Sequence, residues 1–397
     1  MPLFKGALTA TRCRVVGTLP TAAQWEENLE AAWFREPLSP TVVRSAGFCV
    51  VDEPTLCAGA DLNRWLIHDW VLLGWRIDEK RIDGARFKAE LNARIKAWCK
   101  ANARDRVPAS VREEMKETLK LDMLRQTLPS LKVIEIAISL TQGVALFCTA
   151  AEAPLEEIRK ALFRVTGVRF PADGHLGMRG TAADEGAFDQ ALRVADQDWD
   201  PRQVTWVRPG GSGQVVADDE PLRFSRAASA AGFLGWLWAL TEEGDGSVML
   251  GDGNRVVLAI QTEVGLAMPT SEHDEVTVRL DAPGTADEAR AGLRKGRIPT
   301  RLGMWLRRED REYSFILTGS PFGLKAIKLP TQVKSGDLVE VWLDRMYCYE
   351  ELVWALEQLL AHYIEVCHDD VEGPAAVARW VAGLAVREDE AGFEEVE

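Results

Sequence analysis

The chain has 397 residues, which is enough for two or three domains that each bury a hydrophobic core. Apolar residues make up 47% and charged residues 27% of the sequence, a composition typical of folded proteins that excludes an intrinsically disordered chain. The formal net charge of -14 argues against a protein that coats nucleic acid indiscriminately with its whole surface.

Targeting and cysteine patterns indicate a reducing compartment. The N-terminus lacks an uninterrupted apolar segment, and no run reaches the roughly 18 apolar residues that a transmembrane helix needs. The seven cysteines are scattered and include no C-x-x-C pair, as expected for reduced thiols. We therefore expect a cytoplasmic protein.

The first part of the chain predicts mixed strands and helices. After an opening strand, Thr21 and Gln24 match a capping box, which predicts a helix that runs to about Phe34. Residues 41–53 and 64–78 are rich in Val, Ile, Leu and Trp and predict strands.

Residues 86–128 predict a helical hairpin. Four apolar residues of its first helix recur at spacings of four, four and three, which places them on one buried face: Phe87, Leu91, Ile95 and Trp98. A break at Val107 and Pro108 precedes the second helix, where Ser110 and Glu113 match another capping box.

Positive charge is concentrated in this region. From Arg76 to Lys132 there are 15 Lys and Arg against 9 Asp and Glu, which leaves 32 against 52 in the rest of the chain. Basic residues of the first helix fall on an i+4 row that points away from the apolar face. A solvated face is the commoner explanation of an isolated charge row. A basic surface on an acidic body can nevertheless face phosphates, because binding depends on the local potential.

A β-hairpin and a helix are predicted to complete the first half. Residues 133–150 alternate isoleucines with smaller or polar residues and turn at Gln142 and Gly143. A helix follows from about Pro154 to Val165.

Residues 167–222 are rich in Gly, Asp, Pro and Arg, and their RPGGSG lacks the Lys-Ser or Lys-Thr of a phosphate loop. We interpret them as an insertion or interdomain segment.

The second half predicts an apolar core helix over 225–243, followed by a hairpin that turns at Asp252 and Gly253. Further elements are a helix that ends at Gly296, a hairpin over 301–317, and helices over 337–367 and 374–386.

The order of elements predicts an α+β fold of two mixed halves with antiparallel hairpins, a helical hairpin tip and a helical C-terminus. The predicted domains are 1–166, which includes the hairpin 86–128, the segment 167–222, a domain 223–386 and an acidic tail 387–397.

No residue pattern points to catalysis. The five histidines form no H-E-x-x-H signature, and there is no nucleophile elbow, Walker A motif or dinucleotide fingerprint. His362, Cys367, His368 and Asp369 could offer metal ligands, but residues that end a helix are the favoured interpretation. We expect a protein that is not an enzyme and needs no cofactor or metal. A nuclease with carboxylates converging on metal ions stays open as a third interpretation.

The order of several segments resembles the RdgC family of recombination-associated DNA-binding proteins, of which this chain would be a longer, divergent member. The segments are LFKGALTATR, the charged hairpin that ends in LRQTLPSL, then IEIAISLTQGVALF, DEARAGLRKGRIPTRLGMWL and YSFIL. The match covers most of the first 167 residues and about Thr285 to Pro330. The family's turn after the hairpin typically reads Leu-Leu-Pro-Arg-Ala-Phe, whereas here residues 128–132 read LPSLK and lead directly into a strand.

The resemblance implies a horseshoe-shaped subunit that pairs into a homodimeric ring around duplex DNA. Family members bind without sequence preference and restrain the RecA recombinase by occupying its substrate. The resemblance therefore implies a nucleoid-associated, double-stranded DNA-binding protein that modulates RecA-dependent recombination. The alternative on the same scaffold is a protein-interaction module whose acidic surface binds a basic partner.

The candidate DNA-binding residues are basic positions of the hairpin and of a second group near residue 295: Lys88, Lys96, Lys100, Arg104, Arg106, Arg112, Lys116, Lys120, Arg294, Lys295, Arg297 and Arg301. For the second group, cations that complement a helix dipole are an equally good explanation. Candidate dimer contacts are the hairpin tip, residues 106–110, and an apolar set in the C-terminal helices: Trp354, Leu359, Leu360, Tyr363 and Trp380.

Overall fold

The computed structural model describes most of the chain in two compact units. The described residues are 2–57, 64–171, 226–243, 245–268, 275–294, 297–319, 322–331, 333 and 337–368. Unit 1 comprises Met1–Arg14, Cys148–Ala150 and Pro171–Glu397, and unit 2 comprises Val15–Phe147 and Ala151–Phe170. Each unit combines antiparallel strands with helices, which confirms the predicted α+β class. The predicted segment 167–222, the helix 374–386 and the tail 387–397 lie mostly or wholly outside the described residues.

Unit 2 is built on an antiparallel sheet with the strand order β2-β4-β5-β6, in which β3 also pairs with β4. The strands are β2 (Arg44–Cys49), β3 (Leu66–Ile67), β4 (Trp70–Glu79), β5 (Ser130–Ser139) and β6 (Val144–Phe147). Trp75 lies opposite both Phe48 and Ile134, and all three side chains are buried. The turn between β5 and β6 includes Gly143 at φ 67°, as the sequence predicts.

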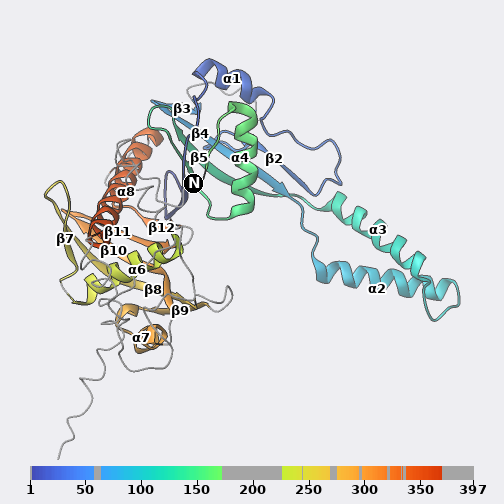
Figure 1. Ribbon diagram of the computed structural model, residues 1–397. Coiled ribbons are helices and arrows are strands. Elements are labelled where there is room, and N and C mark those ends of the chain that lie inside the picture. The colour runs from blue at the N-terminus through green and yellow to red at the C-terminus, as the bar shows by residue number, and fades with distance from the viewer. Residues whose placement is uncertain are drawn as a thin grey trace, which may run out of the picture. The chain divides into compact units, whose positions relative to one another are not determined.

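Two helices pack against this sheet, α1 (Ala22–Glu30) and α4 (Glu152–Thr166) (Figure 1). The predicted capping box at the start of α1 is confirmed, because the Thr21 backbone N–H donates to Gln24 Oε1 over 2.9 Å. The buried face of α1 carries Trp25 and Leu29, and that of α4 carries apolar residues three and four apart: Leu155, Ile158, Leu162 and Val165.

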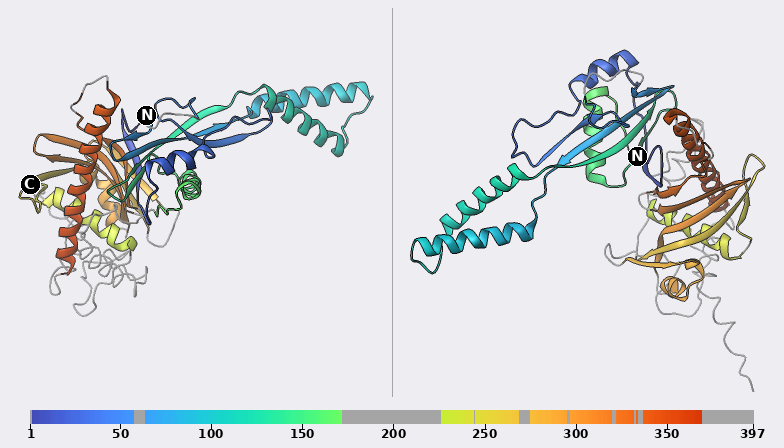
Figure 2. Two further views of the ribbon diagram at one scale, coloured as in Figure 1. Left: turned by 90° about the horizontal axis from the view of Figure 1, so that it is seen from above. Right: turned by 180° about the vertical axis from the view of Figure 1, so that it is seen from behind.

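The helical hairpin consists of α2 (Gly84–Ala101) and α3 (Ala109–Gln126), which extend from one end of the unit 2 sheet (Figures 1 and 2). Its small core is formed by Leu91, Leu119 and Met123, with four partly buried neighbours: Ile82, Phe87, Ile95 and Met115. Three of the four residues predicted for the apolar face of the first helix, Phe87, Leu91 and Ile95, therefore belong to this core, whereas Trp98 is half-buried outside it.

The predicted capping box at Ser110 is wrong. Helix α3 begins two residues earlier than this box requires, its N-cap is Pro108, and no side chain makes a capping hydrogen bond. Ser110 lies in the first turn, where its backbone is helical, so its hydroxyl does not occupy the N-cap position.

Unit 1 contains a second antiparallel sheet, with the order β1-β12-β11-β10-β8-β7 and β9 paired to β8. The strands are β1 (Leu8–Arg14), β7 (Ser247–Met249), β8 (Arg255–Ala267), β9 (Glu275–Leu280), β10 (Ile298–Arg308), β11 (Arg311–Gly319) and β12 (Phe322–Lys328). The predicted hairpins β7–β8 and β10–β11 are confirmed. Strand β8 bulges at Thr262, which has φ 70°, and a Cβ on the facing Gly303 would lie 2.2 Å from the Gln261 carbonyl oxygen.

The helices of unit 1 are α6 (Arg226–Glu243), α7 (Asp287–Arg294) and α8 (Leu338–His368), with a short 3₁₀ helix at Pro283–Thr285. Helix α6 buries all residues from Phe233 to Ala239, which confirms the predicted core helix. Leu359, Leu360 and Tyr363 of α8 are at most 5% exposed, and the Tyr363 ring packs against α6. These three residues are therefore not free for the predicted dimer contact; Trp354 is partly buried, and Trp380 lies outside the described residues.

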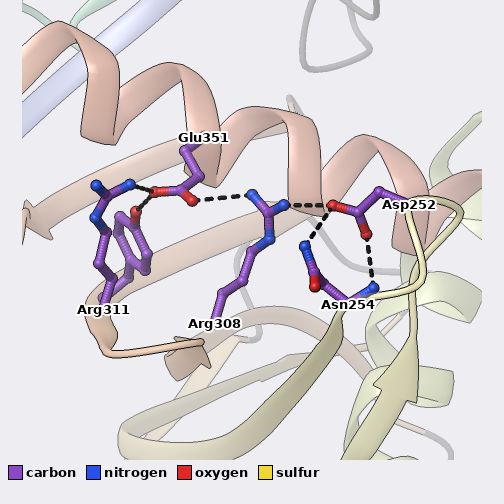
Figure 3. A network of polar contacts seen from close by, with 6 residues as sticks. Asp252, Asn254, Arg308, Arg311 and Glu351 are labelled. Atoms are coloured by element: carbon purple, nitrogen blue, oxygen red, sulfur yellow. Dashed lines mark hydrogen bonds and ion pairs between the residues drawn. The ribbon is translucent and has the colours of Figure 1, made fainter.

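Arg308 of β10 links three elements of unit 1 (Figure 3). Its Nη1 donates to Glu351 Oε1 of α8 over 2.9 Å, and its Nη2 contacts Asp252 in the β7–β8 turn. Glu351 also accepts hydrogen bonds from Arg311 and Tyr313.

None of the helices in the described part of the chain has the length and apolar character that are needed to span a membrane.

Candidate nucleic-acid interface

The helical hairpin is the most basic surface of unit 2. Residues 84–126 contain 11 Lys and Arg against 6 Asp and Glu. Seven of the eight predicted basic residues of the hairpin are exposed and make no ion pair with the described residues: Lys88, Lys96, Lys100, Arg104, Arg106, Arg112 and Lys120. The eighth, Lys116, is 39% exposed and lies 2.7 Å from Glu113. The positive charge of the hairpin is thus mostly unneutralised.

The two helices contact each other through rows of residues four apart. Helix α2 uses Phe87, Leu91 and Ile95, and α3 uses Met115, Leu119 and Met123. Each residue of a helix turns by about 100°, so in an antiparallel pair the positions that follow the contact rows by one residue lie on the same side of the pair. These positions are Lys88, Asn92 and Lys96 in α2 and Lys116, Lys120 and the buried Leu124 in α3. We call this side of the hairpin the basic face.

The other side of the hairpin is electrostatically balanced. Positions that precede the contact rows by one residue include Arg94 and Asp122, whose side chains pair across the two helices at 2.9 Å. Arg86 pairs with Glu90 on the same side at 3.0 Å. The Arg94–Asp122 contact supports the assignment of sides, because only residues on one side of the pair can bridge it. The hairpin therefore has one basic face and one face of paired charges.

The remaining predicted residues of the hairpin lie beyond the centre of the basic face. A row of residues four apart drifts by about 40° per step, so Lys100 turns further from α3 than Lys88 does. Arg104 and Arg106 lie in the connection between the helices, where Ala103 has φ 49°, and Arg112 lies in the first turn of α3. They extend the positive charge to the tip of the hairpin.

The sequence list omitted two exposed cations of the hairpin, Arg86, which pairs with Glu90, and Arg125. Arg125 lies in the last turn of α3 and makes no ion pair with the described residues. It is absent from the list because it follows Lys120 by five positions and so leaves the i+4 row. Its place near the C-terminal end of the predicted hairpin was the sequence signal for it, and it lies towards the face of paired charges.

The second predicted group belongs to unit 1. Arg294 is the last residue of α7, but its side chain and all of Lys295 lie outside the described residues. Arg297 is partly buried, and its backbone N–H donates to the Gly292 carbonyl over 3.1 Å.

Arg301 of the second group lies in β10, where its side chain is 26% exposed. It lies 3.1 Å from Glu275 and 3.5 Å from Glu263, and it donates to Thr277 Oγ1 over 2.6 Å. Its charge is therefore already neutralised by neighbouring strands. Among the predicted site residues, Arg301 has the clearest structural role, because it joins β10 to β8 and β9 through these contacts.

Two further sequence predictions bear on the site. Strand β5 begins at Ser130, directly after Pro129, so the short connection expected after the hairpin is confirmed. Among the described residues, no group of three or more His, Cys, Asp or Glu side chains could hold a metal ion. Of the suggested cluster, only the side chain of His362 belongs to the described residues.

Comparisons with known proteins leave the basic face as the main guide to function. No protein-family model matches the chain, and no curated protein gives a significant match.

Proposed function

We propose that this protein binds double-stranded DNA without sequence preference through the basic face of its helical hairpin. The observation that carries the proposal is the separation of charge within the hairpin. Lys88, Lys96, Lys116 and Lys120 gather on one side, while the opposite side carries the Arg94–Asp122 and Arg86–Glu90 pairs. Lys88, Lys96 and Lys120 make no ion pair with the described residues, so they are available to phosphates.

The length of the basic face suits a nucleic acid backbone. Lys88 and Lys96 are eight residues apart on α2, which corresponds to about 12 Å along the helix. Duplex DNA carries one negative charge per roughly 1.7 Å of its axis, so several phosphates can face this surface at once. A cation already held by two carboxylates, as Arg301 is, supplies less attraction than these exposed lysines.

The side chains on the basic face favour contact with phosphates over recognition of bases. Lysine is a flexible point charge, whereas sequence readout in the major groove relies chiefly on bidentate Arg, Asn and Gln side chains. Asn92 is the only amide in the central rows of this face. We therefore expect similar affinities for unrelated duplex sequences.

The resemblance to the RdgC family extends the proposal to assembly and process. On this basis the chain forms a homodimeric ring around the duplex and modulates RecA-dependent recombination by occupying the DNA. The hairpin tip, residues 106–110, is exposed apart from Val107 and Pro108, which are half-buried. It is therefore accessible for contact with a second copy.

Two matched triple variants of the full chain test the DNA-binding proposal. Lys88→Gln, Lys96→Gln and Lys120→Gln remove three cations from the basic face. Arg86→Gln, Arg94→Gln and Arg125→Gln remove the same charge from elsewhere on the same hairpin. Binding to a 30-base-pair duplex is measured by fluorescence anisotropy between 50 and 200 mM salt.

We expect the first variant to lose affinity on the order of 10- to 100-fold, and the second to lose much less. The slope of log affinity against log salt should shrink by about 0.9 for each phosphate contact that is lost. Equal losses in both variants would show that only net charge matters and would overturn the assignment of the basic face. Absence of binding by the wild-type chain would favour a protein-interaction module. Cleavage of the duplex on addition of a divalent metal would favour a nuclease.

A further inference from the structure

Lys80 connects the sheet of unit 2 to the end of the helical hairpin. It directly follows β4, and its backbone N–H donates to the Val43 carbonyl over 2.8 Å. Its ammonium Nζ donates to the Leu124 carbonyl in the last turn of α3 over 2.9 Å and to the Pro40 carbonyl over 2.7 Å. One side chain thus bridges β4, the loop before β2, and α3.

The Leu124 carbonyl needs an external donor. The last four carbonyls of a helix have no partner within the helix. The Met123 carbonyl is satisfied by Thr127, whose N–H and Oγ1 donate to it over 2.9 and 2.7 Å. Lys80 performs this task for Leu124, which is only 3% exposed, and places a cation at the negative end of the helix dipole. Loss of this donor would leave a carbonyl in a partly buried turn unsatisfied.

Two short segments of the chain connect the helical hairpin to the sheet of unit 2. Helix α2 follows β4 after residues 80–83, and α3 precedes β5 by residues 127–129. Within the described hairpin, the apolar core joins α2 to α3 and includes no residue of β2, β4 or β5. Contacts at the base of the hairpin must therefore hold its angle to the sheet.

We infer that Lys80 is a positioning residue for the basic face, an inference that rests on the proposed function. Its ammonium is engaged by two carbonyls and does not belong to the rows that form the basic face. It acts on DNA through the orientation of α3. Several phosphate contacts must form together, so a hairpin held in one direction binds with a smaller loss of conformational freedom than a loose one.

The test compares Lys80→Met with Lys80→Arg and Lys80→Gln in the full chain. Arginine can still donate to both carbonyls and glutamine to one, so their effects should be smaller than that of methionine. Lys132→Met is the matched control, because Lys132 is an exposed lysine of β5 that makes no ion pair with the described residues. Melting curves establish that each variant is folded.

The first measurement is amide hydrogen exchange of residues 124–128 in the free protein. We expect exchange about tenfold faster in Lys80→Met, and close to the wild-type rate in Lys80→Arg and Lys132→Met. Wild-type exchange in Lys80→Met would overturn the anchoring role whether or not the protein binds DNA.

The second measurement is affinity for a 30-base-pair duplex as a function of salt. Lys80→Met should weaken binding severalfold without changing the salt slope, because no phosphate contact is removed. A salt slope reduced by about 0.9 would identify Lys80 as a direct phosphate contact. Unchanged affinity together with faster exchange would show that anchoring of the hairpin does not serve binding. Either result would overturn the inference. If the wild-type chain binds no duplex, the proposed function fails, and the exchange measurement still decides whether Lys80 holds the hairpin.

Discussion

Arg12 of β1 and Glu357 of α8 pair at 3.1 Å although they are 345 residues apart in the chain. Both are buried, at 7% exposure each. Glu350 adds a second carboxylate 3.6 Å from the same guanidinium. The same helix contributes Arg345, whose side chain donates to the carbonyls of Pro2 and Gly6. These contacts attach the first strand to the last described helix within unit 1.

Disruption of this buried pair should destabilise unit 1. Arg12→Met leaves two carboxylates without their shared cation in a buried site, and removal of one partner of a buried ion pair typically costs about 3–5 kcal/mol. Addition of Glu357→Gln should recover part of that loss, because the two residues interact directly. Urea denaturation followed by tryptophan fluorescence measures both variants. A loss below about 0.5 kcal/mol in Arg12→Met would show that the pair contributes little.

The pairing of β1 illustrates what the sequence could not predict. The opening strand was expected from its composition, but its partner is β12, more than 300 residues later, and no local pattern records such a contact. The ion pairs of Arg301 with Glu263 and Glu275 were hidden for the same reason, since the three residues meet only when β8, β9 and β10 align.

The hairpin was more predictable because its signals are local. The apolar spacing of α2 and the break at Pro108 depend on neighbouring residues alone. The basic rows could also be identified one helix at a time. The sequence could not show that the two basic rows lie on the same side of the hairpin, because this follows from the antiparallel packing of Leu91 against Leu119. The wrong capping box at Ser110 arose from a shift of two residues in the start of α3.

Cys49 should be unreactive in the folded protein. Burial raises the pKa of its thiol to about 12, aided by the nearby Cys57 thiol, and only the thiolate reacts with alkylating agents. At pH 8 we expect iodoacetamide to modify Cys49 far more slowly in native protein than in urea. Peptide mass spectrometry over a time course gives both rates, and equal rates would contradict the buried position.

The raised pKa of Cys49 also predicts that the folded protein loses stability at alkaline pH. The folded-state pKa of Cys49 lies above the unfolded value of roughly 8.5, so the folded state holds its proton more tightly. The stabilisation is fully present below pH 8.5 or so and is lost as the pH rises towards 12. Cys49→Ala should flatten this part of the stability–pH curve, measured by urea denaturation at several pH values. A variant with the wild-type pH dependence would exclude Cys49 as the source.

Charge reversal at the outer part of the basic region should abolish most duplex binding. Lys96→Glu, Lys100→Glu and Arg104→Glu change exposed side chains outside the hairpin core, so the melting curve should stay close to that of the wild type. Repulsion of phosphates should lower affinity more than neutral substitutions do. An electrophoretic shift assay at low and moderate salt measures the change. Unchanged affinity and salt slope would remove this helix from the DNA site.

The basic group at the end of α7 requires a separate variant. Arg294→Ala, Lys295→Ala and Arg297→Ala should weaken duplex binding with little change in melting temperature if these residues contact phosphates. Cations at a helix C-terminus also complement its dipole, typically by 0.3–1 kcal/mol each. A lower melting temperature with retained DNA affinity would therefore assign them a structural role. Arg301→Gln serves as the internal comparison, because its ion pairs predict lost stability.

A ring around DNA requires a homodimer with self-complementary contacts. Leu359, Leu360 and Tyr363 are buried, so an apolar contact of unit 1 with a second copy must use other residues. Leu343 and Tyr347 are exposed on one side of α8, at 39% and 59%. We expect a dimeric mass in light scattering at micromolar concentration, and a shift towards monomer in the variant Leu343→Lys with Tyr347→Lys.

Leu131→Lys provides the matched control for this assembly test, because Leu131 is an exposed apolar residue of unit 2 at 48%. It should leave the mass unchanged. If the α8 variant remains dimeric, the contact lies elsewhere, and the hairpin tip becomes the next surface to alter. A strictly monomeric wild-type mass across a tenfold dilution series would rule out a stable ring under these conditions. The basic face would then have to bind DNA as a single copy, with an affinity limited to the phosphates that one hairpin can reach.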